Sequence, residues 1–184
     1  MRVEKTSLEG CLLIDDTLFE DERGYFFESF NAQKFQKETG MNINFVQDNQ
    51  SRSVRGVLRG LHYQTGDFAQ AKLVRVLQGE VLDIAVDIRK SSATFGQYYS
   101  TVLSEKSKTQ LFIPRGFAHG FLVLSDTADF FYKCDNYYNK QSEGGITFND
   151  PDINIDWQMQ ASELIISPKD LELPYLLIRK MFFK

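Results

Sequence analysis

The chain contains only two histidines, and each lies in a short segment whose other residues suit ligand binding or proton transfer. His62 lies in RGLHYQ (residues 59–64), and His119 lies in PRGFAHGF (residues 114–121). Histidine has the ordinary side-chain pKa nearest to neutrality, so the two segments point to proton transfer or to metal binding. A zinc or iron site of imidazole and carboxylate type needs about three protein ligands. Because the chain offers two imidazoles at most, we expect no metal.

The second of these segments has a recognisable form. Residues 114–119 read Pro-x-Gly-x-x-His, which resembles the second motif of the cupin superfamily, where the histidine comes from a strand of a small barrel. In metal-binding cupins the first motif is His-x-His followed by Glu, whereas this chain reads His62-Tyr63-Gln64. The resemblance therefore implies organic acid and base catalysis without a metal or another cofactor. A metal-dependent cupin oxygenase is the alternative, and it would require bound metal.

The size and composition of the chain fit one folded unit. It has 184 residues, of which 42% are apolar and 14% are aromatic, so we expect a single domain over residues 1–184. The net charge of −4 and the isoelectric point near 5.3 count against a nucleic-acid partner, because phosphate backbones need a basic face. There is no apolar run of roughly 18 residues and no apolar secretion signal, so we expect a cytoplasmic protein without a membrane span.

The two cysteines, Cys11 and Cys134, are far apart in the sequence and have no spacing typical of a zinc or redox motif. We expect both to be reduced and to have structural roles.

The candidate catalytic and binding residues must be positioned by strands, because apolar and polar residues largely alternate from residue 72 onward. The segment 73–78 is rich in β-branched residues, and the segment 81–88 alternates with Asp83 and Asp87 on one phase. A turn at Gly79 between these segments predicts that they pair as a hairpin. Short strands at such spacing, with few helical stretches, predict an all-β sandwich or barrel. Further strands are predicted at residues 97–103, 110–113, 119–124 and 128–134.

Two short helices are expected. The first covers residues 32–38, because Asn31 can cap its start and Gly40 can end it. The second includes residues 168–171, because Ser167 is a good N-cap and proline suits the first turn.

Several segments, in order and at matching spacing over nearly the whole chain, together resemble the RmlC-type sugar nucleotide epimerases. No single segment would suffice for this resemblance. The segments are DERGYFFESFN (residues 21–31), FVQDNQSRS (45–53), VLRGLHYQ (57–64), AKLVRVLQGEVLDIAVDIR (71–89), IPRGFAHGF (113–121), YKCDNYY (132–138) and SPKD (167–170).

The resemblance implies a cupin-type jelly-roll fold, catalysis without a metal, and a homodimer whose N-terminal strands are exchanged. The implied reaction inverts C3 and C5 of dTDP-4-dehydro-6-deoxy-D-glucose to give dTDP-4-dehydro-L-rhamnose, a step toward activated L-rhamnose. The nucleotide sugar is the expected partner of the site.

The resemblance also implies catalytic roles for four residues. His62 matches the base, and Asp170 matches the carboxylate that pairs with the base and orients it. Tyr132 matches the general acid on the opposite face of the sugar, and Lys72 is placed to stabilise the enolate oxygen by its charge. From the sequence alone, Asp170 is better interpreted as an exposed residue in the first turn of a helix and Tyr132 as a core aromatic, and the resemblance reverses both interpretations.

Further positions match the binding residues of these epimerases. Three cations lie where substrate and diphosphate are held, and an aromatic residue lies where the thymine ring stacks. The cations are Arg23, Arg59 and Lys169, the aromatic residue is Tyr138, and the other matching positions are Glu28, Gln47, Asn49, His119 and Glu143. The resemblance implies that Arg23 and Glu28 lie on the exchanged segment and reach the site of the partner subunit.

Three other functions remain open at this stage. A monofunctional 3- or 5-epimerase of another deoxysugar pathway would share the base, the acid and the fold. A sugar nucleotide 3,4-ketoisomerase is more remote, because Gln64 stands where such cupins tend to carry a histidine-rich run. A non-catalytic sugar-nucleotide-binding cupin would have lost the base or the acid, and both are present in this chain.

Overall fold

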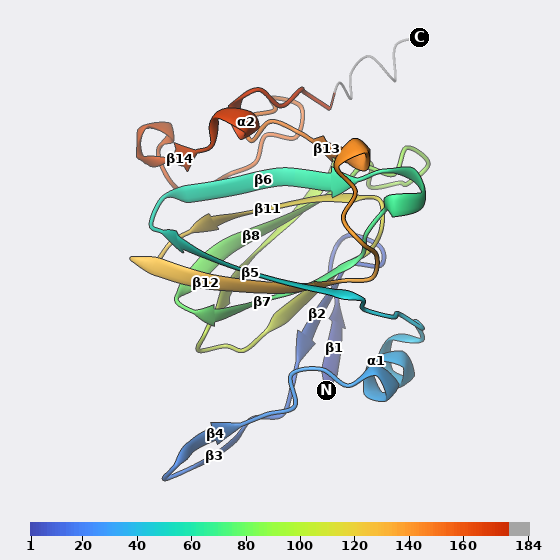
Figure 1. Ribbon diagram of the computed structural model, residues 1–184, viewed down its shortest axis with the longest axis vertical. Helices are drawn as coiled ribbons and strands as arrows, with labels where there is room; N and C mark the ends of the chain where they lie inside the picture. Colours follow the sequence, from blue (N-terminus) through green and yellow to red (C-terminus); the bar gives the residue numbers. More distant parts are fainter. Residues whose placement is uncertain (177–184) are drawn as a thin grey trace.

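The computed structural model describes residues 1–176, and its longer strands form two sheets that face each other (Figure 1). The first sheet has the order β1 (Arg2–Lys5), β2 (Leu12–Asp15), β10 (Gln110–Ile113), β7 (Lys72–Gln78), β12 (Thr127–Cys134) and β5 (Gln47–Val54). The second sheet has the order β13 (Glu143–Gly145), β6 (Val57–Gln64), β11 (Phe117–Val123), β8 (Glu80–Asp87) and β9 (Tyr98–Ser104), and β14 (Ile165–Ile166) pairs with β6. The prediction of an all-β, jelly-roll sandwich of the cupin type with a few short helices is confirmed.

The remaining elements are short. A hairpin of β3 (Phe19–Asp21) and β4 (Gly24–Phe26) projects from the sandwich at the bottom of Figure 1. The helices are α1 (Ala32–Thr39) and α2 (Pro168–Leu171), and single 3₁₀ turns cover Gly66–Phe68, Lys140–Ser142 and Ala161–Glu163. None of the helices in residues 1–176 is long and apolar enough to cross a membrane.

Both helices begin where their capping residues predict. The Asn31 side chain accepts a hydrogen bond from the Lys34 backbone N–H at 3.1 Å, and Gly40 ends α1 with a φ of +74°. The Ser167 hydroxyl accepts the Asp170 backbone N–H at 3.1 Å at the start of α2. Capping depends on residues within one turn of each other, so the sequence was sufficient to locate both helices.

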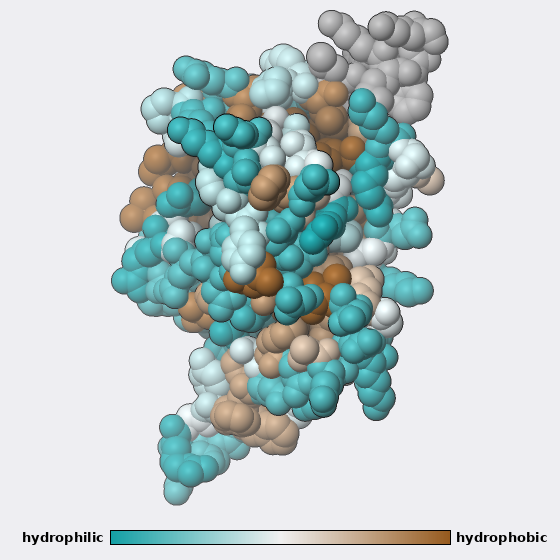
Figure 2. All heavy atoms as spheres, turned by 45° about the vertical axis from the view of Figure 1, so that its right-hand side comes forward, coloured by the Kyte–Doolittle hydropathy of each residue, from teal (hydrophilic) through white to brown (hydrophobic). Residues whose placement is uncertain are grey.

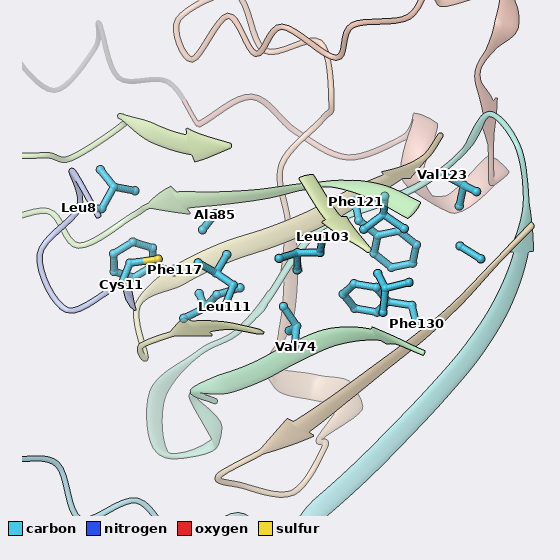
Figure 3. Packing of buried hydrophobic residues seen from close by; sticks show 14 residues of the cluster. Leu8, Cys11, Val74, Ala85, Leu103, Leu111, Phe117, Phe121, Val123 and Phe130 are labelled. Atoms are coloured by element: carbon cyan, nitrogen blue, oxygen red, sulfur yellow. The ribbon is translucent and has the colours of Figure 1, made fainter. Parts of the chain in front are cut away.

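The hydrophobic core forms three layers around the two sheets. Val74, Ala85, Phe121 and Phe130 belong to the cluster between the sheets, which is shown from close by in Figure 3. A second cluster covers the outer face of the β6–β11–β8 sheet with side chains that include Trp157. A third cluster packs Phe35 of α1 against the outer face of the other sheet, on Leu12, Ile14, Leu73 and Phe112. Because both faces of the central strands are buried, these strands can carry long apolar runs.

The hairpin that the sequence predicts between residues 73–78 and 81–88 is wrong. β7 pairs with β10 and β12 in the first sheet, whereas β8 pairs with β11 and β9 in the second sheet. Gly79, with a φ of +80°, therefore passes the chain from one sheet to the other. A Cβ at this position would lie 2.2 Å from the Thr127 carbonyl oxygen, so the corner requires glycine. The alternating pattern identified both strands but contained no information about their partners.

Strands β6 and β11 approach each other closely at a pair of glycines. A Cβ on Gly60 would lie 2.6 Å from Gly120 Cα and 2.8 Å from the His119 carbonyl oxygen. A Cβ on Gly120 would lie 2.8 Å from the Arg59 carbonyl oxygen. The register of the two strands shifts here, between His119 and Phe121. This contact fixes the relative position of the strands that carry the two histidines.

We predict that Gly60→Ala lowers the free energy of unfolding by about 3 kcal/mol, through backbone strain and the clash with β11. Gly24→Ala is the matched control, because Gly60 and Gly24 have φ values of +126° and +121°, but a Cβ on Gly24 meets no atom within 4 Å. We expect this control to lose about 1 kcal/mol from strain alone. Denaturant titration of both variants measures the difference, and equal losses would contradict a structural role for the contact.

Candidate active site

A cavity of about 590 Å³ opens between the two sheets, and side chains from both sheets line it. His62 comes from β6 and His119 from β11, and these residues are register partners across the two neighbouring strands. Tyr132 of β12 and Lys72 of β7 come from the opposite sheet, and Asp170 comes from α2. The cavity therefore collects the sequence-predicted proton donors and acceptors, which lie far apart in the chain.

His62 is paired with Asp170. The His62 Nε2 atom lies 2.7 Å from Asp170 Oδ1, and the Gly60 backbone N–H donates to Asp170 Oδ2 at 3.3 Å. The Asp170 side chain is 6% exposed, whereas the His62 side chain is 33% exposed and reaches the cavity. Asp170 lies in the first turn of α2, but it is buried against His62, so the interpretation of this residue as an exposed first-turn carboxylate is wrong. Its carboxylate leaves Nδ1 as the ring nitrogen of His62 that is open to a bound molecule.

Local structure brings Asp170 to His62. β14 runs parallel to β6, with Ile165 beside Val57 and Ile166 beside Leu58. The chain then enters α2, where the Ser167 cap fixes the first turn. The segment that carries Asp170 is thereby attached to the strand that carries His62.

The second histidine has a carboxylate partner that the sequence analysis did not identify. His119 Nε2 lies 3.1 Å from Asp83 Oδ1 and 3.0 Å from Asp83 Oδ2. Asp83 lies on β8 and is completely buried. A signal was present in the sequence, because Asp83 is an ionisable residue within an otherwise apolar run, and buried charges require a partner. The identity of that partner depended on the pairing of β8 with β11.

Tyr132 and Lys72 form the opposite wall of the cavity. Lys72 Nζ lies 5.8 Å from the centroid of the Tyr132 ring, and Lys72 has no ion pair within residues 1–176. Burial lowers the pKa of the Lys72 ammonium group, although Cys134 and Asp83 act in the other direction. Burial also raises the pKa of the Tyr132 hydroxyl. Tyr132 therefore keeps its proton at neutral pH, and the charge of Lys72 is easiest to maintain when an anion lies nearby.

A second cavity of about 280 Å³ adjoins the first. The two cavities share Asn49, His62, Lys72 and Tyr132, and Gln47, Tyr138 and Glu143 line the second. Polar contacts connect these residues: the Tyr138 backbone N–H donates to Gln47 Oε1 at 3.0 Å, and Gln47 Nε2 donates to Asn49 Oδ1 at 3.1 Å. The Tyr138 ring is 53% exposed, so its face is free to stack on a planar group.

Glu143 connects the two cavities by accepting two hydrogen bonds. Lys169 Nζ donates to Glu143 Oε1 at 2.7 Å, and the Tyr138 hydroxyl donates to Oε2 at 3.0 Å. The hydrogen bond from Lys169 lowers the pKa of Glu143, and the same contact raises the pKa of Lys169. The bond to Glu143 also raises the pKa of Tyr138. Glu143 is therefore an anion that holds a lysine and a tyrosine hydroxyl at the junction.

Arg59 is a third cation that lines the first cavity, beside Lys72 and Lys169. It is exposed, and its Nε donates to the Ser53 hydroxyl at 3.1 Å. Together with Lys169 it gives the cavity two cationic groups that suit an anionic ligand.

Arg23 and Glu28 are the two predicted binding residues that line neither cavity. Arg23 lies at the turn of the projecting hairpin, and Glu28 follows that hairpin, where Lys34 of α1 donates to it at 2.7 Å. The hairpin also exposes Phe19 and Phe26, at 62% and 70%. In Figure 2 this lower end of the molecule combines a hydrophilic tip with an apolar surface. The structure therefore does not bring these two residues to the cavity of their own chain.

Within residues 1–176, no group of three or more histidine, cysteine, aspartate or glutamate residues lies close enough to hold a metal ion. Cys11 and Cys134 are free and buried.

The geometry can be compared with known proteins. The model of one family, described as dTDP-4-dehydrorhamnose 3,5-epimerase, matches residues 5–177. A dTDP-4-dehydrorhamnose 3,5-epimerase of Escherichia coli is 54% identical over 170 residues, which cover 92% of this chain and 91% of that protein.

Solved structures of similar proteins have the same fold. The crystal structure of dTDP-4-dehydrorhamnose 3,5-epimerase from Elizabethkingia anophelis has a TM-score of 0.92 and 56% identity, and the match covers 95% of this chain and 96% of that one. A structure of dTDP-6-deoxy-D-glucose-3,5-epimerase RmlC from Legionella pneumophila, in complex with dTDP-4-keto-L-rhamnose, has a TM-score of 0.92 and 49% identity, covering 96% and 94% of the two chains.

Because the chain has only two histidines, NMR spectroscopy can follow each imidazole separately. Under mildly alkaline conditions, we predict that both rings carry their proton on Nε2, the atom that contacts a carboxylate. Asp170→Ala removes the acceptor of one ring, so the ¹⁵N shifts of His62 should move toward a mixture of tautomers, while those of His119 stay unchanged. Unchanged His62 shifts in the folded variant would contradict the pairing.

Proposed function

The chain belongs to the dTDP-4-dehydrorhamnose 3,5-epimerase family, and on this basis we propose that it inverts C3 and C5 of dTDP-4-dehydro-6-deoxy-D-glucose to give dTDP-4-dehydro-L-rhamnose. It is a carbohydrate epimerase that acts on a nucleotide sugar in the formation of dTDP-L-rhamnose. The observation that carries the proposal is the cavity between the sheets, with the His62–Asp170 pair on one side and Tyr132 on the other.

His62 is the base. The C4 ketone of the sugar acidifies the protons on C3 and C5, so a neutral imidazole can remove them. Asp170 accepts the Nε2–H of His62 at 2.7 Å, which leaves the Nδ1 lone pair for the substrate proton and stabilises the imidazolium that forms. A base placed in this way contributes on the order of 10²- to 10⁴-fold to the rate.

Lys72 and Tyr132 act once the proton has left. Removal of the proton moves negative charge to the C4 oxygen, and the ammonium group of Lys72 stabilises it electrostatically. Because burial disfavours an isolated charge on Lys72, this interaction is stronger with the enolate than with the neutral ketone. Tyr132 then delivers its proton to the carbon from the opposite face, which inverts the centre. Solvent returns a proton to Tyr132 and removes one from His62 before the second centre reacts.

The nucleotide lies along the second cavity. Tyr138 stacks on the thymine ring, and Gln47, Asn49 and Glu143 are the polar groups around it. Arg59 and Lys169 hold the diphosphate, which competes with Glu143 for the ammonium group of Lys169. His119 contacts the sugar.

The active assembly is a homodimer with exchanged N-terminal segments. The exposed aromatic residues Phe19 and Phe26 support this proposal, because a monomer leaves them in water. It also gives Arg23 and Glu28 a role, since both lie away from the cavity of their own chain. We place the enzyme in the cytoplasm, where its two free cysteines would stay reduced.

The reaction itself provides the first test. The protein is incubated with dTDP-4-dehydro-6-deoxy-D-glucose in D₂O, the product is trapped with the matching reductase, and deuterium at C3 and C5 is counted by NMR. We expect label at both carbons and an L-rhamnose product. Label at one carbon would indicate a monofunctional epimerase, and no label would contradict the proposed function.

Variants then separate the base from the acid. His62→Ala should reduce exchange at both carbons on the order of 10²- to 10⁴-fold. Tyr132→Phe should retain exchange but give little inversion. Tyr99→Phe is a matched control, because Tyr99 packs against the same interior cluster and does not line the cavity. Exchange at the wild-type rate in His62→Ala would refute the assignment of the base.

Mixed dimers test the exchange of the hairpin. Arg23→Ala and His62→Ala chains, each with little activity alone, are co-expressed with different tags. If Arg23 serves the partner's site, each mixed dimer contains one complete site, and random assembly should restore about a quarter of the wild-type activity. Purified mixed dimers without activity would show that Arg23 serves its own chain.

A further inference from the structure

We propose that Asp83 is a positioning residue for the epimerisation, which holds His119 so that its Nδ1–H donates to the sugar oxygen that gains negative charge. This inference rests on the proposed function and adds to it a second carboxylate–imidazole pair beside His62–Asp170. It gives Asp83 a role that the comparisons and the sequence motifs do not assign.

The geometry of the pair determines which ring nitrogen faces the sugar. Both Asp83 oxygens lie within 3.1 Å of His119 Nε2, so this nitrogen carries a proton that the carboxylate accepts. Nδ1 has no hydrogen-bond partner within residues 1–176, and His119 lines the cavity. Nδ1 is thus the only ring nitrogen available to a bound sugar.

The position of Asp83 makes a purely structural role costly. Its side chain is 0% exposed and lies on the phase of β8 that faces the interior cluster, with Val81 and Ala85 on either side. A carboxylate buried in this way loses its hydration, and an apolar residue of similar volume would stabilise the core at least as well. Within residues 1–176, its hydrogen bonds go to His119 alone. The free-energy cost of burying the Asp83 carboxylate is therefore offset by its interaction with His119.

The surroundings also hold the imidazole ring in place. The His119 ring stacks on Phe130 with a centroid distance of 5.9 Å and an interplanar angle of 23°, and Phe130 in turn stacks on Phe121 at 4.1 Å. The ring has little room to turn away from Asp83. A fixed donor loses little entropy when the oxyanion forms, which is the condition for efficient electrostatic stabilisation.

The two imidazoles have different roles on the same face of the sugar. His62 and His119 are register partners on β6 and β11, whereas Tyr132 lies on the opposite sheet. His119 is therefore on the side of the base and is not placed to supply the proton from the opposite face. When the ring carries both protons, Asp83 accepts the one on Nε2, and Nδ1–H is then the donor that faces the cavity. His119 thus assists Lys72 at the oxygen while His62 acts at the carbon.

Another aspartate on the same strand provides a matched control. Asp87 lies four residues from Asp83, on the same phase, and its side chain is also 0% exposed. Its contacts differ: burial raises its pKa, but hydrogen bonds from Arg89, Ser92 and Thr94 outweigh this and hold the pKa at about 2. Asp87 lines neither cavity. Asp87→Asn should therefore lower the melting temperature and leave kcat unchanged.

The experiment is a double-mutant cycle of Asp83→Asn and His119→Gln, with kcat and KM measured for the nucleotide sugar. Asp83→Asn should lower kcat about 100-fold with less change in KM, as expected when one oxyanion donor is lost. The double variant should be no slower than His119→Gln alone, because Asp83 acts through His119. Unchanged kcat in Asp83→Asn, multiplicative losses in the cycle, or an equal loss of kcat in Asp87→Asn would overturn the proposal.

A second measurement does not depend on activity. The ¹⁵N shifts of His119 should change in Asp83→Asn, while those of His62 should not, and unchanged His119 shifts would also overturn the proposal. If Asp83→Asn does not fold, Asp83→Ala replaces it in both measurements. Wild-type protein without deuterium exchange would refute the proposed function, whereas normal wild-type exchange with an unaffected Asp83 variant would refute this inference alone.

Discussion

Strand β6 pairs with three other strands, and the arrangement of the candidate active site depends on these pairings. β11 pairs along one edge, where Gly60 and Gly120 allow the backbones to touch. β13 pairs with the end of β6 that carries His62, and β14 runs parallel to its beginning. These three pairings bring His119, Glu143 and the segment of Asp170 to the strand of His62. A displacement of β6 would therefore disturb the proposed base, its carboxylate and the proposed nucleotide-binding residues together.

Burial gives the groups around the cavity their chemical character. Both histidines are paired with carboxylates whose side chains are almost fully buried, so each ring has one fixed and one open nitrogen. Burial keeps the proton on Tyr132 and disfavours an isolated charge on Lys72. In the proposed reaction, the enolate oxygen would supply the negative charge that stabilises the Lys72 ammonium group. Desolvation would then favour the transition state over the neutral substrate.

The hydrophobic core and the candidate active site share the same strand faces. On β12, Phe130 and Tyr132 lie on one phase, and on β11, Phe117, His119 and Phe121 do the same. The inward-facing residues are apolar over most of the length of these strands, and they are ionisable where the cavity opens. Phe130 belongs to both functions, because it fills the interior and stacks on the His119 ring. Such sharing explains why substitutions of the catalytic groups must be compared with stability controls.

The sequence by itself determined part of the local structure and the types of chemical group available. Alternation located the strands between residues 72 and 134, and the caps Asn31 and Ser167 located both helices, because each signal lies within a few residues of the element. The polar alternation of β5 and the glycine-containing pattern of β6 did not indicate strands without their neighbours. Only the tertiary structure decided the sheet partners of β7 and β8 and the pairing of Asp83 with His119. The contact of His62 with Asp170 across 108 residues was implied by the family resemblance and by no local pattern. The physical reason is that these contacts depend on which strands lie next to each other. Strand pairing joins segments that are far apart in the sequence, and the residue pattern within one segment does not identify its partner.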